Sequence, residues 1–201
     1  GNGKTCVVNT DGTVSVVGGA SQATGTAVEF ENAQTADPAA AFDSVNNKIL
    51  LVYEDSISSN AGTAIVGTIS GTSISFGSPS VWDVGVDYPN VAFDTNTNKF
   101  LIAYKDLSEQ KGKAIVATVS GTSVSFGTAS IFNAANTQHI GIAFDSNANK
   151  FAISFRDGGN SNYGTGIVAT ISGTSVSFGS ETVFKSASTL YNSTLFDSSA
   201  N

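Results

Sequence analysis

The chain has 201 residues, of which 40% are hydrophobic and 12% charged, and its formal net charge is −7. That length allows a sizeable core in one or two domains. An acidic chain without a basic run lacks the charge needed to hold a phosphate backbone, so we expect no nucleic-acid partner. No apolar stretch approaches the roughly 18 residues of a membrane-spanning helix, so we expect no membrane insertion.

Cysteine and methionine usage adds two expectations. The single cysteine, Cys6, excludes an intrachain disulfide, and the TCVV context predicts a small core residue in a strand. The chain contains no methionine and shows no signal peptide. Both absences are expected of a processed product or of a segment of a longer protein.

An internal repeat of 51 to 52 residues runs through the chain. Its first marker is Ala-Phe-Asp, which becomes Leu-Phe-Asp in the last copy, with the phenylalanines at Phe42, Phe93, Phe144 and Phe196. A second marker, Gly-Thr-Ser-Ile/Val-Ser-Phe-Gly, begins at Gly71, Gly121 and Gly173. Self-similarity at such a period is typical of repeat architectures.

In chain order, we expect one repeat domain over residues 1–201. Residues 1–40 form the second half of a repeat, residues 41–91, 92–142 and 143–194 form three full repeats, and residues 195–201 begin the next. Each repeat carries four strand signals, with β-branched residues and period-2 alternation. Examples of the four are Asn90 to Asp94, Ile49 to Tyr53, Ala64 to Ile69, and a fourth that starts at Ser73 and continues to Trp82.

The turns between these strands carry their own signals. Gly71 occupies the first central position of a two-residue hairpin, where a type II′ turn needs positive φ, and this predicts pairing of Ile69 with Ile74. Asp43 to Lys48 is an Asn-rich turn whose side chains can cap their own backbone. Two hairpins per repeat predict an all-β fold, a β-propeller-like array of four-stranded antiparallel blades, with three full repeats and partial repeats at both ends.

The chain ends are expected to fall inside a repeat. Residues Gly3 to Val8 align with Gly112 to Ala117 in the third strand, and Asn201 aligns with Asn47 between strands one and two. The two ends together would supply strands one, three and four of a fourth blade, without strand two. Two interpretations stay open: an excerpt of a longer array, and a four-bladed ring with one short blade.

The stretch from Gly62 to Gly77, GTAIVGTISGTSISFG, resembles repeats of long tail-fibre-like or structural proteins of marine bacteriophages and some bacteria. The resemblance also covers the AFDxxxNK segment and the aromatic-x-Asp strand ends across the three full repeats. It implies the repeat type and a virion-surface or extracellular location. It supplies no catalytic motif.

The copies differ unevenly, which separates two faces of the expected blades. The turns after strands one and three are nearly constant, whereas the connections after strands two and four vary in every copy. Variable loops on a rigid scaffold are where binding residues concentrate. The candidate ligand-binding residues on this variable-loop face are Asp55, Asp87, Tyr88, Asn90, Asp106, His139, Asp157, Tyr163, Tyr191 and Asn192.

Some polar residues of the chain match parts of metal-binding or catalytic motifs, but each has a simpler structural explanation. The triplets Asp94/Asn96/Asn98 and Asp145/Asn147/Asn149 match the opening of a calcium loop but lack its Gly and distal Glu, which favours a simple Asx turn and no metal or cofactor. The once-per-repeat Asp55, Asp106 and Asp157 favour structural hydrogen bonding over a catalytic acid pair. His139, the only histidine, has no nucleophile elbow to serve.

We therefore expect a non-enzymatic structural or adhesive binding module of an extracellular or virion-surface protein. Its partners would be surface glycans or neighbouring proteins in an assembly, met through the variable loops. Two alternatives remain. One is a glycan-active propeller enzyme, whose mark would be acids present in one blade only and facing a central pocket. The other is an architectural filament or fibre subunit, for which open strand edges would favour a homo-oligomer.

Overall fold

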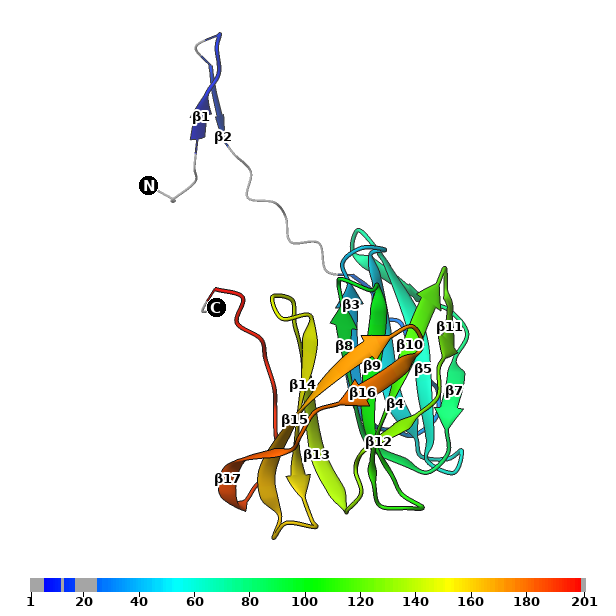
Figure 1. Cartoon of the computed structure of the whole chain (residues 1–201). Helices are drawn as coiled ribbons and strands as arrows, with labels where there is room; N and C mark the ends of the chain where they lie inside the picture. Colours follow the sequence, from blue (N-terminus) through cyan, green and yellow to red (C-terminus); the bar gives the residue numbers. More distant parts are fainter. Residues whose placement is uncertain (1–5, 12, 17–24, 200–201) are drawn as a thin grey trace.

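The computed structural model describes residues 6–11, 13–16 and 25–199, and these residues form strands and turns without a helix. They build three antiparallel sheets and one two-stranded hairpin (Figure 1). The all-β class is thereby confirmed. Within the described part of the chain, no helix has the length and apolar character to cross a membrane.

The three sheets repeat one plan. The hairpin pairs β1 (Cys6–Val8) with β2 (Val14–Val16). Sheet 1 contains β3 (Thr35–Asp43), β4 (Lys48–Asp55), β5 (Ala61–Ser70), β6 (Ser73–Phe76) and β7 (Ser80–Asp83). Sheet 2 contains β8 (Val86–Asp94), β9 (Lys99–Asp106), β10 (Gly112–Ser120), β11 (Ser123–Phe126) and β12 (Ser130–Asn133). Sheet 3 contains β13 (Thr137–Asp145), β14 (Lys150–Asp157), β15 (Tyr163–Ser172), β16 (Ser175–Phe178) and β17 (Thr182–Ser188).

Each sheet is an antiparallel meander whose fourth strand is broken in two. In sheet 1 both β6 and β7 pair with β5, on the edge away from β4. The expected continuation of the fourth strand to Trp82 is therefore confirmed. The first strand is longer than the sequence indicated, because β8 begins at Val86 rather than near Asn90. A register shift between Asp87 and Asn90 lets this strand run through a segment that looked like a loop.

The turn predictions agree with the backbone. Ile69 pairs with Ile74, as expected, and Gly71 has a φ of 60°. In the Asn-rich turn, the Asp43 carboxylate accepts hydrogen bonds from the amides of Val45 and Asn46. Asn47, at the end of that turn, takes the left-handed conformation that Asn tolerates.

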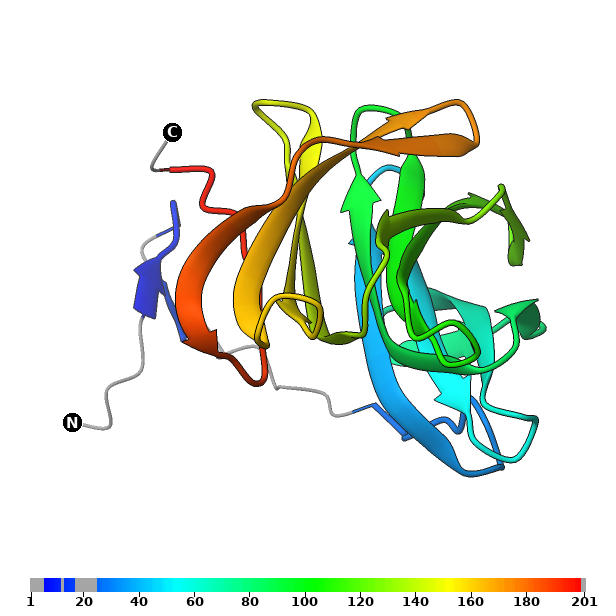
Figure 2. The same cartoon turned by 60° about the horizontal axis from the view of Figure 1, so that its bottom comes forward.

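Successive sheets pack face to face, so that sheet 2 lies between sheets 1 and 3 (Figure 2). Strand β9 is consequently buried on both sides. Its Ile102 packs against sheet 1, and its Leu101 and Ala103 pack against sheet 3. This two-sided burial accounts for the unbroken apolar run of β9, since each fully buried Leu or Ile contributes about 1.5–3 kcal/mol.

An aromatic contact recurs at each sheet boundary. The Trp82 ring lies 6.0 Å from the rings of Tyr104 and Phe126 in the next sheet. The same geometry joins Phe132 to Phe155 and Phe178. Residues 25–34, which belong to no strand before Thr35, place Phe30 against Tyr53 and Phe76 in the same way.

The first strands β3, β8 and β13 lie side by side and form the inner edge of the stack. The described residues do not close into a ring. Residues 189–199 carry no strand, so the segment that was expected to begin the next repeat pairs with no sheet there, although the Thr194 hydroxyl hydrogen-bonds the Ser154 hydroxyl at 2.6 Å. The end alignment also involves Gly3 to Thr5 and Asn201, which lie outside the described residues.

Candidate functional site

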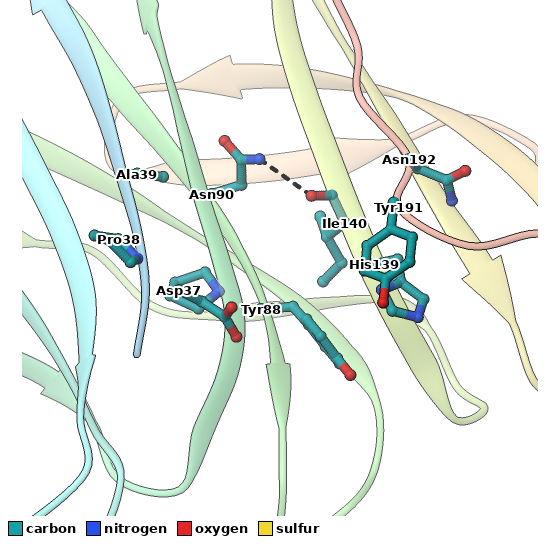
Figure 3. A pocket seen from close by; sticks show the side chains of 10 residues that line it. Asp37, Pro38, Ala39, Tyr88, Asn90, His139, Ile140, Tyr191 and Asn192 are labelled. Atoms are coloured by element: carbon teal, nitrogen blue, oxygen red, sulfur yellow. Dashed lines mark hydrogen bonds between the residues drawn. The ribbon is translucent and has the colours of Figure 1, made fainter. Parts of the chain in front are cut away.

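A cavity of about 430 Å³ opens where the inner strands meet on the variable-loop face (Figure 3). We call it the axial cavity. It is lined by short segments at equivalent positions in successive repeats: Asp37 to Ala39, Tyr88 to Asn90, His139 and Ile140, and Tyr191 and Asn192. Five of the ten candidate residues therefore come together here, namely Tyr88, Asn90, His139, Tyr191 and Asn192.

One of the positions that line the axial cavity has a left-handed backbone in every repeat. Asp37, Tyr88, His139 and Tyr191 have φ values of 46°, 51°, 51° and 56°. In the three sheets this residue lies at the register shift of the first strand. The left-handed conformation costs a non-glycine residue roughly 1–2 kcal/mol. None of the four is glycine, which would adopt it freely.

The shared conformation brings aromatic rings together. The Tyr88 ring centroid lies 5.0 Å from that of His139, and His139 lies 5.0 Å from Tyr191. Burial and the nearby Arg156 lower the pKa of His139, which favours a neutral imidazole. Burial and the neighbouring Asp87 raise the pKa of Tyr88, which keeps its hydroxyl protonated. These rings thus offer apolar surface together with uncharged hydrogen-bonding groups.

Two amide side chains complete the polar lining. The Nδ2 of Asn90 donates to the Ile140 carbonyl at 3.1 Å, which joins β8 to β13 (Figure 3). The Nδ2 of Asn192 is shielded and has no hydrogen-bond partner among the described residues. A shielded donor without a partner is uncommon in native structures and calls for a functional or structural reason.

Three carboxylates gather beside the axial cavity. The side-chain oxygens of Asp37, Glu54 and Asp87 lie within 4.8 Å of one another, and only Asp37 among them lines the cavity itself. Burial and the charge of Asp87 raise the pKa of Glu54, and burial also raises the pKa of Asp87 against the opposing effect of Lys105. Oxygen ligands so placed suit a hard cation such as Ca²⁺, but the Lys105 ammonium already lies 3.6 Å from Asp87.

Sequence reasoning missed Asp37 and Glu54. Glu54 corresponds to Lys105 and Arg156 in the other repeats, and Asp37 corresponds to Tyr88. Comparing copies position by position would have found this asymmetry, because acids appear at these positions in one repeat only.

Five candidate residues lie outside the axial cavity: Asp87 in the carboxylate group, and four others in or beside the turns that follow the second strands. The Asp55 carboxylate accepts from the amides of Ile57 and Ser58. Asp157 accepts from the Gly159 amide and the Asn133 side chain. Asp106 makes the equivalent turn contacts and an ion pair with Lys113, and Tyr163 begins β15. The three aspartates therefore fix turns, as their recurrence indicated.

The two calcium-loop segments form turns of the same kind. The Asp94 carboxylate accepts from the amides of Asn96 and Thr97 and from the Thr97 hydroxyl. The Asp145 carboxylate accepts from the amides of Asn147 and Ala148. Because one oxygen of each carboxylate receives two backbone amides, the geometry is that of an Asx turn.

A comparison of this chain with protein-family models, curated proteins and solved structures finds no match.

Proposed function

We propose that the three sheets are blades of a β-propeller-type array and that the chain is a non-enzymatic binding module of an extracellular or virion-surface protein. The observation that carries the proposal is the left-handed position that lines the axial cavity. Asp37, Tyr88, His139 and Tyr191 occupy it at a conformational cost that glycine would avoid. Side chains kept in strained backbone positions are concentrated at functional sites.

A glycan is the ligand class that fits this lining best. Sugar rings present apolar faces that stack on aromatic side chains and hydroxyls that bond to amides. Tyr88 and Tyr191 supply the rings, and Asn90 and Asn192 supply the amides. A cavity of about 430 Å³ lies in the range of small-ligand sites, which run from roughly 300 to 1,000 Å³. A neighbouring protein that inserts a loop into the cavity is the alternative partner.

A glycan array tests the proposal. Tyr88→Gly and Tyr191→Gly remove one ring each and leave a residue that adopts the left-handed backbone freely, so the scaffold is preserved. We expect each variant to lose binding at least tenfold. Tyr163→Ala is the matched control, because Tyr163 lies outside the cavity. If glycans bind and both glycine variants bind as the unmodified chain does, the axial cavity is not the site.

A glycan-active enzyme is the second candidate, favoured by one specific observation. Asp37, Glu54 and Asp87 each occupy a position that carries an acid in one copy of the repeat only. The three meet beside the axial cavity. Retaining glycosidases use two carboxyl groups about 5–5.5 Å apart, one of them with a raised pKa. Glu54 has the raised pKa such an acid needs. Glycan hydrolysis that is lost in Glu54→Gln would establish this function in place of the first.

The surrounding assembly is also part of the proposal. The resemblance to tail-fibre-like repeats supports an appendage of a virion or a secreted surface protein. A purely architectural fibre subunit is the remaining alternative. It predicts that no glycan or protein ligand depends on Tyr88 or Tyr191.

A further inference from the structure

Each sheet presents two unlike faces to its neighbours. We use "forward face" for the four positions that in sheets 1 and 2 pack against the following sheet, and for their counterparts in sheet 3. These residues pair across the second and third strands, as Leu50 does with Val66. The forward faces consist of Leu50, Val52, Ala64 and Val66 in sheet 1, Leu101, Ala103, Ala114 and Val116 in sheet 2, and Ala152, Ser154, Gly166 and Val168 in sheet 3.

Two of these faces are covered and the third is open. Val66 and Val116 are 0% and 1% exposed, whereas Val168 in the same place on sheet 3 is 49% exposed. Phe184, the counterpart of Trp82 and Phe132, is 57% exposed. A groove of about 270 Å³ crosses this forward face, with Ala152, Val168 and Phe184 in its lining. Such an apolar face on a sheet needs a cover.

The C-terminal segment already takes the inner place of a fourth repeat beside sheet 3. Tyr191 stands 5.0 Å from His139, the same ring separation as between His139 and Tyr88. Thr194 hydrogen-bonds Ser154 on the forward face and borders the groove. A fourth repeat therefore has its first segment in position on this side.

The N-terminal side shows the matching end of the same repeat. Residues 25–34 pack against sheet 1 in the way that β7, the last strand of sheet 1, packs against sheet 2. The Tyr53 hydroxyl donates to Glu31, just as the Tyr104 hydroxyl donates to Asp83. Phe30 contacts Tyr53 as Trp82 contacts Tyr104. The two outer ends of the stack thus each carry one flank of a fourth repeat.

The hairpin β1–β2 is the part of the chain that precedes residues 25–34, as β10–β11 precedes β12. Cys6 aligns with Ile115, which packs between sheets 1 and 2. From Gly12 to Phe30 there are 18 residues, against 11 from Gly121 to Phe132, so seven more residues are available for reach.

We infer that the hairpin β1–β2 of this same chain docks on the forward face of sheet 3, although it lies apart from the sheets in Figure 1. The occupant is the chain's own hairpin rather than a second copy, because both flanking segments of the fourth repeat are already seated on this chain. Docking would place Cys6 near Ala152 and Val168, because its counterpart Ile115 shares one core cluster with Leu50 and Val66. The inference is independent of the proposed ligand.

The single cysteine makes the test direct. A disulfide requires Cβ atoms about 3.5–4.5 Å apart, so it can form only when the hairpin reaches the forward face. Val168→Cys is therefore expected to form a disulfide with Cys6 within one chain under mild oxidation. Ile131→Cys is the control, since Ile131 is 46% exposed, close to the 49% of Val168, but lies on sheet 2. We expect the first variant to cross-link at least tenfold faster, at a rate that does not depend on protein concentration. Mass spectrometry and non-reducing electrophoresis measure both.

Two outcomes of the cross-linking would overturn the inference. Equal rates in the two variants would mean that the hairpin does not visit the forward face. Disulfide-linked dimers formed by Val168→Cys alone would mean that a second copy covers it.

A second measurement needs no new cysteine. Cys6 in the unmodified chain should react with a thiol reagent at least tenfold more slowly than in urea, and Val168→Lys should remove this protection because it places a charge in the interface. Ile131→Lys should leave the protection intact. Reaction of the unmodified chain at the rate found in urea would contradict the inference independently of the cross-link.

Discussion

The side-chain amide of Asn90 joins two sheets, because its Nδ2 donates a 3.1 Å hydrogen bond to the backbone carbonyl of Ile140. Its Oδ1 accepts from the Val91 amide, so both ends of the amide are used. We expect Asn90→Ala to lower the free energy of unfolding by about 1–2 kcal/mol, since the carbonyl loses its partner in a partly buried place. Urea denaturation measures the change. The exposed Asn32 provides the control Asn32→Ala, and equal stability of the two variants would contradict this role.

Two glycines of sheet 2 are expected to resist substitution for different reasons. A Cβ at Gly121 would meet nothing within 4 Å, so Gly121→Ala costs only the left-handed conformation at φ 62°, about 1–2 kcal/mol. A Cβ at Gly127 would lie 1.9 Å from the Thr174 carbonyl oxygen of the next sheet, so Gly127→Ala must separate the sheets and costs more. In thermal unfolding, about 2–4 °C corresponds to each kcal/mol at this size. A smaller loss for Gly127→Ala would count against the close approach of the sheets.

Glu54 is expected to weaken the fold at neutral pH. Its pKa in the folded chain is raised by burial and by Asp87, so ionisation destabilises the folded state. Glu54→Gln should therefore raise the free energy of unfolding at pH 7, and the gain should shrink as the pH falls toward the ordinary value of 4.5, below which Glu54 is protonated in both states. Denaturant titrations from pH 3 to 8 measure it, with the exposed Glu29→Gln as control. A gain that persists unchanged at pH 3 would exclude ionisation as the cause.

Asp106 is expected to behave in the opposite way. Burial opposes its ionisation, but hydrogen bonds from Lys113, Ser108 and the Glu109 amide hold its pKa well below the usual range. Asp106→Asn should cost about 1–3 kcal/mol at pH 7, and the difference should disappear as the pH falls below the ordinary value of 3.8. Glu109→Gln, which alters the exposed partner of Lys113, should leave stability unchanged. A loss that is independent of pH would argue against the ion pair.

The local signals of the sequence predicted strands and turns well because they act over a few residues. Gly71 indicated both the hairpin and the pairing of Ile69 with Ile74, and the structure has both. The left-handed conformation of Tyr88 was not predictable from its residue type, since Tyr rarely adopts it. The surrounding register shift imposes it, and this is a property of strand pairing. The segment around Tyr88 was therefore mistaken for a loop.

The candidate site was predicted in part for a similar reason. The variable segments contain Tyr88, His139 and Tyr191, because differences between copies are visible in the sequence. Their convergence on one cavity depends on how the sheets stack. Asp55, Asp106 and Asp157 lie in the connections after the second strands but are the same in every copy, and their carboxylates accept hydrogen bonds from turn amides.

The left-handed position makes the chemistry of the axial cavity separable from the scaffold. Asp, Tyr and His occupy it in different repeats with φ values that differ by 10° at most, from 46° to 56°. The backbone at this point therefore does not depend on which side chain it carries. These four positions can be substituted one at a time. A new ligand specificity can therefore arise by point mutation while the fold of the sheets stays the same. A library randomised at residues 37, 88, 139 and 191 would exploit this modularity directly.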